Sequence, residues 1–236
     1  MTSEPVHLVS TAGYAAIRLV FLQTIMKRGH LPLAELESMF GELEVQDPSS
    51  RDIQQLLASM NLEISSYGFE VRQISFRDET YVGFVNKEAD ACSAKATGYR
   101  KDGKPNGAYT SFFGALLEAM ATSDTGTVSD QDAYYLPIRV AGGGGASQGD
   151  VVTQEGGESG GSRSQGREEG GTLEMSLTER QRALDPFLAD GWLAREGGDA
   201  FGFGPRTLLE LSQVVLSMEQ VTDHTRQYVN HCLGRG

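Results

Sequence analysis

The chain has 236 residues, of which 39% are hydrophobic, and its 32 acidic and 20 basic residues leave a formal net charge of −12. This charge disfavours a protein whose main activity is direct nucleic-acid binding, because neutralising phosphates requires clustered Lys and Arg. The N-terminus lacks a signal-peptide pattern, the longest apolar stretch is too short to span a bilayer, and Cys92 and Cys232 imply no disulfide framework. We therefore expect a soluble intracellular protein of one or two domains that binds other proteins.

After a disordered start over residues 1–9, residues 13–28 are predicted to form a helix that is apolar around most of its circumference. The residues expected on its main apolar face are Ile17, Val20, Phe21 and Ile25, and those that widen it are Leu19, Leu22 and Met26. A face this wide predicts contact with more than one neighbour. Phe21, Leu22 and Met26 are the candidate contacts to a partner protein, and burial of all of them within the chain is the alternative.

A helix over residues 32–43 is followed by another whose apolar side chains repeat with helical spacing from Ile53 to Ile64, with Ser49 as its candidate N-cap. Beyond Gly68, aromatic and β-branched residues form two short runs around a polar turn at residues 77–80, which indicates a β-hairpin. Three helices followed by a hairpin are the order of a winged-helix domain, here over residues 10–87.

Residues 88–106 are polar and predict a linker, and residues 107–220 repeat the order of helices and hairpin. In this second unit Ser176 and Glu179 have capping-box spacing. The final helix is expected from Arg206 to about Met218, and the polar residues 221–236 follow without a closing element. The predicted fold class is therefore mainly α with small β-hairpins (α+β), with tandem winged-helix domains.

Residues 141–171 interrupt the second unit and contain 12 of the 29 glycines and no aromatic residue. Such a composition does not bury enough apolar surface to offset the entropy of ordering, so a disordered insertion is predicted. The run of glycines at residues 142–145 lacks the Gly-Lys-Ser/Thr ending of a phosphate loop. No phosphate site is predicted there.

No constellation of reactive side chains has the spacing of a catalytic site. His224, His231 and Cys232 are the only clustered metal-ligand types, and a structural zinc site requires four ligands in tight pairs. We therefore predict no catalytic, metal-binding or cofactor-binding residue in this chain.

The helices that would read DNA in a winged-helix protein lack the expected side chains, which are outward Arg, Lys, Asn or Gln. In the first unit, Arg51 stands against Asp52 and Glu63, a net charge of −1. In the second, the two basic residues of residues 179–190 stand against three acidic ones, again −1. Acidic outward faces fit protein assembly better than groove reading.

Four short motifs occur in a characteristic order: Phe21–Gln23 with Ile25–Met26, Val82–Asn86, Phe113 with Leu116–Glu118, and Phe187–Leu193. This order resembles the non-structural maintenance of chromosomes element 1 family, a RING-bearing winged-helix subunit of the SMC-five/six complex. The resemblance covers roughly residues 12–222, and the glycine-rich insertion has no counterpart in it.

The resemblance implies a scaffold subunit that binds a MAGE-type winged-helix subunit and, with it, a kleisin. It implies a nuclear, chromosome-associated complex that supports DNA repair and recombination. Double-stranded DNA would be contacted mainly through the partners, the SMC-five/six core would be reached indirectly, and no membrane is involved.

Family members usually end in a RING-like zinc domain, and full-length members are classed as ubiquitin ligases on that basis. If Asn230–Cys232 aligns with the first zinc pair, Val229 stands where the first cysteine belongs, and the remaining ligands are absent. Zinc is therefore expected only in a RING-like domain outside this chain, and the enzyme assignment stays open. The alternatives are a RING-type E3 ubiquitin ligase subunit whose zinc domain lies elsewhere, and a stand-alone DNA-binding winged-helix protein.

Overall fold

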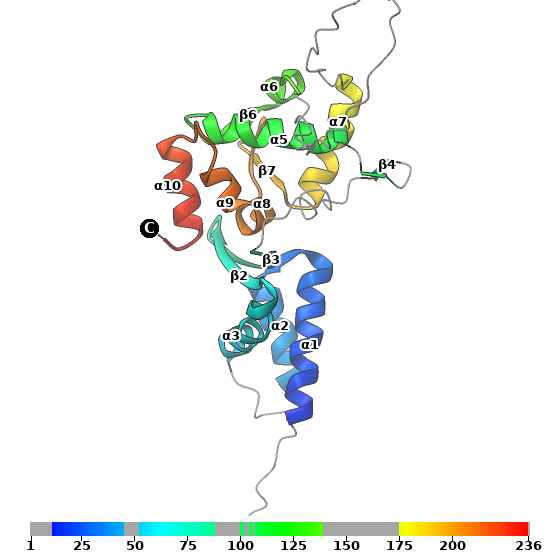
Figure 1. The fold of residues 1–236 in the computed structure, drawn as a ribbon, viewed down its shortest axis with the longest axis vertical. Coiled ribbons are helices and arrows are strands. Elements are labelled where there is room, and N and C mark those ends of the chain that lie inside the picture. Colours follow the sequence, from blue (N-terminus) through cyan, green and yellow to red (C-terminus); the bar gives the residue numbers. More distant parts are fainter. Residues whose placement is uncertain are drawn as a thin grey trace, which may run out of the picture.

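The computed structural model describes residues 11–44, 52–87, 100–101, 104–105, 107–138 and 175–235. The described chain is mainly helical with small antiparallel sheets, which confirms the α+β class. It is arranged as an N-terminal unit, from α1 to β3, and a C-terminal unit, from α5 to α10, stacked along the long axis (Figure 1). Residues 1–9 and 141–171, predicted to be disordered, lie outside the described residues.

The N-terminal unit contains α1 (Thr11–Arg28), β1 (His30–Pro32), α2 (Leu33–Glu44), α3 (Ile53–Ile64), the short 3-10 helix η1 (Ser65–Tyr67), β2 (Phe69–Phe76) and β3 (Glu79–Asn86). The predicted hairpin is confirmed, with β2 and β3 antiparallel around Arg77 and Asp78, which both have positive φ. A two-residue turn of this kind matches the twist of the strands. The strand β1 was not predicted, because three residues carry no periodicity, and it pairs with β3 to give the order β1-β3-β2.

Helix α3 begins at a cap different from the expected one. The Asp52 carboxylate accepts a hydrogen bond from the Gln54 backbone N–H at 3.1 Å, while Ser49 lies outside the described residues. Further along α3, the Asn61 side chain donates to the Val71 carbonyl at 2.9 Å and accepts from the Val71 N–H at 2.6 Å. This pair of bonds ties α3 to the outer edge of β2.

The C-terminal unit follows a small hairpin of β4 (Arg100–Lys101) and β5 (Lys104–Pro105). Its elements are α5 (Gly107–Thr122), β6 (Thr127–Ser129), α6 (Asp130–Tyr135), α7 (Leu177–Ala189), β7 (Leu193–Glu196), β8 (Ala200–Phe203), α8 (Pro205–Glu210), α9 (Ser212–Leu216) and α10 (Asp223–Cys232). The sheet order is β6-β8-β7, so the first strand pairs with the third, as in the N-terminal unit. Helix, strand, helix, helix and hairpin therefore occur twice.

The local predictions for the C-terminal unit are partly correct. The capping box is confirmed: Ser176 Oγ accepts from the Glu179 N–H, and Glu179 accepts from the Ser176 N–H at 2.9 Å. The single final helix is wrong, because Leu211 departs from helical geometry and separates α8 from α9. Residues expected to be a polar stretch without a closing element form α10, which buries Val229 and Cys232.

Two clusters of buried side chains form the cores. One joins α1, α2, α3 and the near part of the hairpin around Phe21 and Leu56. The other fills the C-terminal unit around Phe112 and Phe187, and it also includes Phe76 at the far end of β2. The hairpin of the N-terminal unit therefore contributes to the core of its neighbour, and the two units are packed together rather than tethered.

Candidate partner-binding surface

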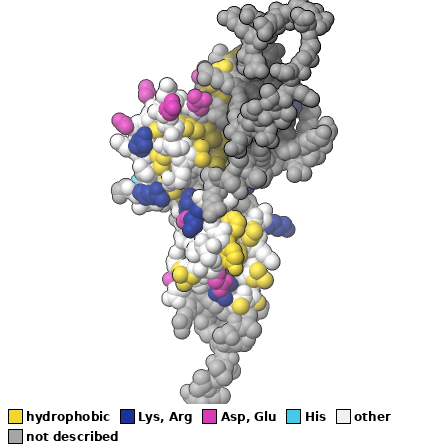
Figure 2. Space-filling model, in the orientation of Figure 1, with side chains coloured by type: hydrophobic (Ala, Val, Ile, Leu, Met, Phe, Trp, Pro, Cys, Tyr) yellow, Lys and Arg dark blue, Asp and Glu magenta, His cyan; other side chains and the backbone are white. Residues whose placement is uncertain are grey.

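Helix α1 has two apolar faces, and only one of them is covered. Phe21 and Ile25 are fully buried, and the Phe21 ring meets the Phe40 ring edge-on at a centroid distance of 6.0 Å. On the opposite side Leu19, Val20 and Met26 remain 55%, 48% and 52% exposed. Hydrophobic side chains gather on the face of the N-terminal unit along which α1 runs (Figure 2). Exposed apolar groups gathered on one helix are typical of a surface that a partner covers.

The three candidate contact residues on α1 differ in how far the fold buries them. Phe21 lies in the core and has no surface to offer a partner. Leu22 is half-buried at the margin of the core, and Met26 is exposed. Of the predicted contacts, Met26 and the edge of Leu22 are therefore available on the outside of α1.

The prediction missed Leu19 and Val20 as outward residues, and it assigned Val20 to the buried face. The signal that separates the faces is the seven-residue spacing from Leu19 to Met26, which keeps both on one side of a helix and away from Phe21. Helix α1 carries apolar side chains around most of its circumference. Periodicity alone therefore did not reveal which of its faces the neighbouring helices cover.

The seam between the units is built from the hairpin β2–β3 and helix α8. Arg72 Nη1 donates to the Leu209 carbonyl at 2.6 Å, and its Nη2 lies 3.1 Å from Glu70 Oε2. At the hairpin tip, Arg77 donates to the Arg195 carbonyl and forms an ion pair with Glu196 at 2.7 Å. Both arginines of the hairpin are thus engaged by the C-terminal unit.

His30 lies in the same seam, beside the backbone of Gly191 and 6.0 Å, between ring centroids, from Tyr81. Its Nδ1 is buried and has no hydrogen-bond partner in the described structure. Burial lowers the pKa of His30, the positive charge of Arg206 lowers it further, and Asp190 acts in the opposite direction. The seam therefore favours neutral His30.

We expect the seam to weaken in mild acid. Because the folded pKa of His30 lies below the unfolded value of about 6.5, its contribution to the unfolding free energy is complete above that pH and is lost as the pH falls toward the folded pKa. Urea unfolding between about pH 5 and pH 8 should therefore show a smaller pH dependence for His30→Asn than for the natural chain.

His224→Asn is the matched control, because it replaces an exposed histidine of α10 that lies outside the seam. Glu210 titrates in the opposite sense, because burial raises its pKa, but it is present in both variants and cancels in the comparison. Equal pH profiles for His30→Asn and the natural chain would contradict the assignment.

Three of the side chains that a groove reader would direct toward DNA make contacts within this molecule instead. In α3, Asn61 is held by Val71, and Gln54 pairs with Gln73 at 2.9 Å. In α7, Arg180 is buried, donates to the carbonyls of Met175 and Leu136, and lies over the Phe112 ring. Burial lowers the pKa of Arg180. Through its two hydrogen bonds, Arg180 connects the chain just before residues 139–174 with the chain just after them.

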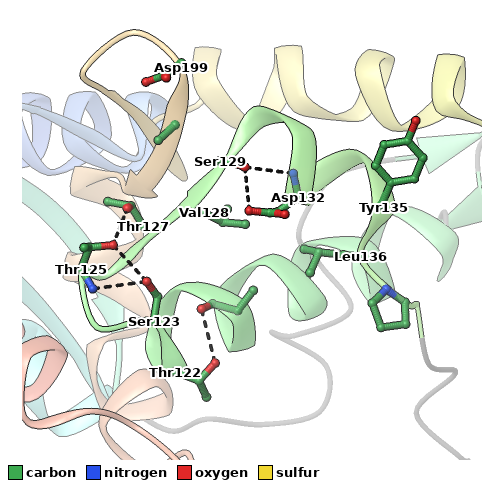
Figure 3. A pocket seen from close by; sticks show the side chains of 13 residues that line it. Thr122, Ser123, Thr125, Thr127, Val128, Ser129, Asp132, Tyr135, Leu136 and Asp199 are labelled. Atoms are coloured by element: carbon green, nitrogen blue, oxygen red, sulfur yellow. Dashed lines mark hydrogen bonds between the residues drawn. The ribbon is translucent and has the colours of Figure 1, made fainter.

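A hollow of about 710 Å³ lies between the end of α5, β6 and α6 (Figure 3). Its hydroxyl groups bond one another: Thr125 Oγ1 lies 3.0 Å from Ser123 Oγ and 2.8 Å from Thr127 Oγ1. Ser129 caps α6 and bonds the Asp132 carboxylate at 2.7 Å. The hydroxyl groups of the hollow are used in hydrogen bonds within local turns and the α6 cap. They do not form a nucleophile–base pair of the kind a catalytic site requires.

The three candidate metal ligands on helix α10 are close in sequence but differ in exposure. Cys232 is buried, and burial raises the pKa of its thiol and of the neighbouring Tyr228 hydroxyl, whereas His224 and His231 are exposed. Among the described residues, no group of three or more His, Cys, Asp or Glu side chains is placed to hold a metal ion. No helix in the described ranges combines the length and apolar character needed to cross a membrane.

These features define a class: a mainly helical protein of two packed units, with an exposed apolar face on one of its helices. The family described as Nse1 non-SMC component of SMC5-6 complex matches residues 18–211. The chain belongs to this family. Among proteins of curated function, none matches it.

A chain in a solved structure of an Nse1-Nse3-Nse4 complex is similar in fold, with a TM-score of 0.61 and 14% sequence identity. The similarity covers 85% of this chain and 73% of that chain. At this identity the likeness establishes the shared fold, and the assembly is a property of that structure.

Proposed function

We propose that this chain is a scaffold subunit of the SMC-five/six complex that binds a MAGE-type winged-helix subunit and, with it, a kleisin. Membership of the Nse1 family supports the complex, and the fold shared with a chain of an Nse1-Nse3-Nse4 assembly supports the partners. The observation that carries the proposal is the exposed apolar face of α1, formed by Leu19, Val20 and Met26.

We further propose that both units are winged helices, with domains over residues 10–87 and 107–220 and a linker over residues 88–106. The repeated element order and the shared strand order support this interpretation. The first hairpin is used in the seam, so its wing holds the two units together. A wing engaged in this way does not reach a DNA groove.

In this proposal the chain contacts double-stranded DNA mainly through its partners and reaches the SMC core indirectly. The formal charge of −12 and the internal use of Arg72, Arg77 and Arg180 support that division of labour. A nuclear, chromosome-associated location and a role in DNA repair follow from the complex.

Replacing the apolar face of α1 with charge should abolish the assembly. The double variant Leu19→Glu and Met26→Glu places carboxylates where an apolar partner surface would have to desolvate them, at a cost of about 2 kcal/mol or more each. When the chain is co-expressed with MAGE-type and kleisin subunits, the natural chain should co-elute with both in size-exclusion chromatography, and the double variant should elute alone.

Leu62→Glu is the matched control, because Leu62 is 81% exposed on α3 and lies outside the α1 face. This variant should keep the complex. If the natural chain itself does not co-elute with either subunit, the scaffold function is wrong. If the natural chain and the α1 double variant both co-elute with the two subunits, the function stands and the surface is wrong.

A further inference from the structure

A groove of about 930 Å³ runs along the outer side of α5 in the C-terminal unit. One wall is formed by Leu136 and Pro137 after α6, and the other by residues 218–220 after α9. The groove shares Ala119 and Thr122 with the hydroxyl-lined hollow described above, so the two form one continuous depression. It lies in the other unit from the exposed face of α1.

The floor of the groove is made of small side chains. Helix α5 buries Phe112, Leu116 and Met120 in the core and turns Gly114, Ala115 and Ala119 toward the groove. A Cβ atom built at Gly114 would meet no atom within 4 Å, so this part of the helix is open. Small residues at helical spacing let another helix approach to an interaxial distance of about 8 Å.

The charged side chains that line the depression, among the described residues, have one sign. Glu118 and Glu219 line the groove, and Asp132 and Asp199 line the adjoining hollow, whereas no Lys, Arg or His of the described ranges lines either. Neither Glu118 nor Glu219 forms a salt bridge with another residue in the described part of the chain. In Figure 2 the C-terminal unit shows an apolar area with acidic side chains along its upper side and Lys or Arg side chains to its left and below it.

The shape and the charge together select the occupant. The floor from Thr110 to Thr122 corresponds to about 18 Å of helix, the length of roughly three turns of a helix lying along it. The small apolar residues in the middle of the floor suit apolar side chains. The exposed carboxylates of Glu118 and Glu219, which have no salt-bridge partner among the described residues, favour cations beside them. Nucleic acid is excluded by the same carboxylates, because they repel phosphate.

We propose that the α5 groove binds an amphipathic, basic helix of a partner protein. The apolar face of that helix lies on Gly114, Ala115 and Ala119, and its Lys or Arg side chains pair with Glu118 and Glu219. This second docking surface goes beyond the α1 face and does not depend on it.

The probe is a synthetic peptide of about 16 residues built from Leu, Ala and Lys, with leucines at helical spacing and a fluorescent label. A second peptide with Glu in place of Lys reports the charge requirement. Fluorescence anisotropy with the purified full chain should show binding of the Lys peptide and at least about tenfold weaker binding of the Glu peptide.

Gly114→Leu fills the groove from its floor and should weaken Lys-peptide binding by about tenfold or more. The substitution should not unfold α5, because Leu has a higher helix propensity than Gly and the site is open. Gly41→Leu is the matched control, since Gly41 is an exposed helical glycine of α2 that also has open space around it.

Glu118→Lys with Glu219→Lys should weaken binding to a similar degree, whereas Glu37→Lys with Glu42→Lys on α2 changes the net charge equally and should leave binding intact. Equal binding by all variants would show a general attraction to an acidic chain and would overturn the site, as would a failure of the Lys peptide to bind. Light scattering that shows a dimer dissociated by Gly114→Leu would assign the groove to a second copy instead. Loss of co-elution in the α1 experiment would not change any of these results.

Discussion

Gly204→Ala is expected to destabilise the protein by about 3 kcal/mol or more, in spite of adding one methyl group. A Cβ atom at this position would lie 2.7 Å from the Gly191 carbonyl carbon and 2.8 Å from that of Trp192, and backbone atoms have little freedom to move away. The local hydrogen bonds make the site rigid, because the Gly204 N–H donates to the Trp192 carbonyl and the Arg206 N–H donates to the Gly191 carbonyl, both at 3.0 Å.

The Gly204→Ala substitution should also weaken the contact between the two units, because Gly204 is the N-cap of α8 and α8 forms part of the seam. Moving the start of α8 displaces Leu209, whose carbonyl accepts from Arg72 and whose side chain packs against Gly83. Urea unfolding should therefore show a lower midpoint, and limited proteolysis should separate the two units more readily.

Gly114→Ala is the control for Gly204→Ala, because it adds the same methyl group to an open helical site. It should leave the unfolding free energy unchanged or raise it by up to about 1 kcal/mol. A Gly204→Ala protein with a free energy of unfolding within about 1 kcal/mol of the natural chain would refute the packing argument.

Phe21→Ala should cost about 3–5 kcal/mol of unfolding free energy, whereas Met26→Ala should change it by less than about 0.5 kcal/mol. Phe21 is fully buried against Phe40, so truncation leaves a cavity in a core that joins three helices. The Met26 side chain is half in solvent, and its removal leaves no cavity.

For partner binding the order should reverse: among correctly folded molecules, Met26→Ala should lose more affinity than Phe21→Ala. The affinity of folded chains for the MAGE-type subunit should fall for Met26→Ala, because the exposed face of α1 becomes smaller. Comparing urea unfolding with isothermal titration of the two variants would separate the roles. Equal loss of stability in both variants would mean that Met26 belongs to the core.

Sequence periodicity was sufficient for elements that carry a complete signal of their own. The hairpin β2–β3 and the capping box at Ser176 were predicted from local patterns, and both are present in the structure. The strands β1 and β6 were not predicted, because each has three residues and exists through pairing with a distant strand. Helix α10 was not predicted because its few buried residues, including Val229, are dispersed among polar ones.

The candidate surfaces depended still more on the tertiary arrangement. Apolar residues around α1 indicated a partner face, but packing against α2 and α3 decided that Phe21 is internal and that Leu19 and Met26 are external. The groove on α5 is formed by segments after α6 and after α9, which are far apart along the chain. No local pattern reports such a meeting of distant segments.

Local propensity and charge are properties of neighbouring residues, so the chain alone decided that it is acidic, mainly helical and built from a twice-repeated order of helices and a hairpin. Which faces are covered depends on contacts between residues far apart in sequence, so only the folded molecule decided that the first hairpin joins the two units and that one side of α1 stays exposed. Burial is a cooperative outcome of the whole fold, because a side chain is removed from water by its neighbours in space.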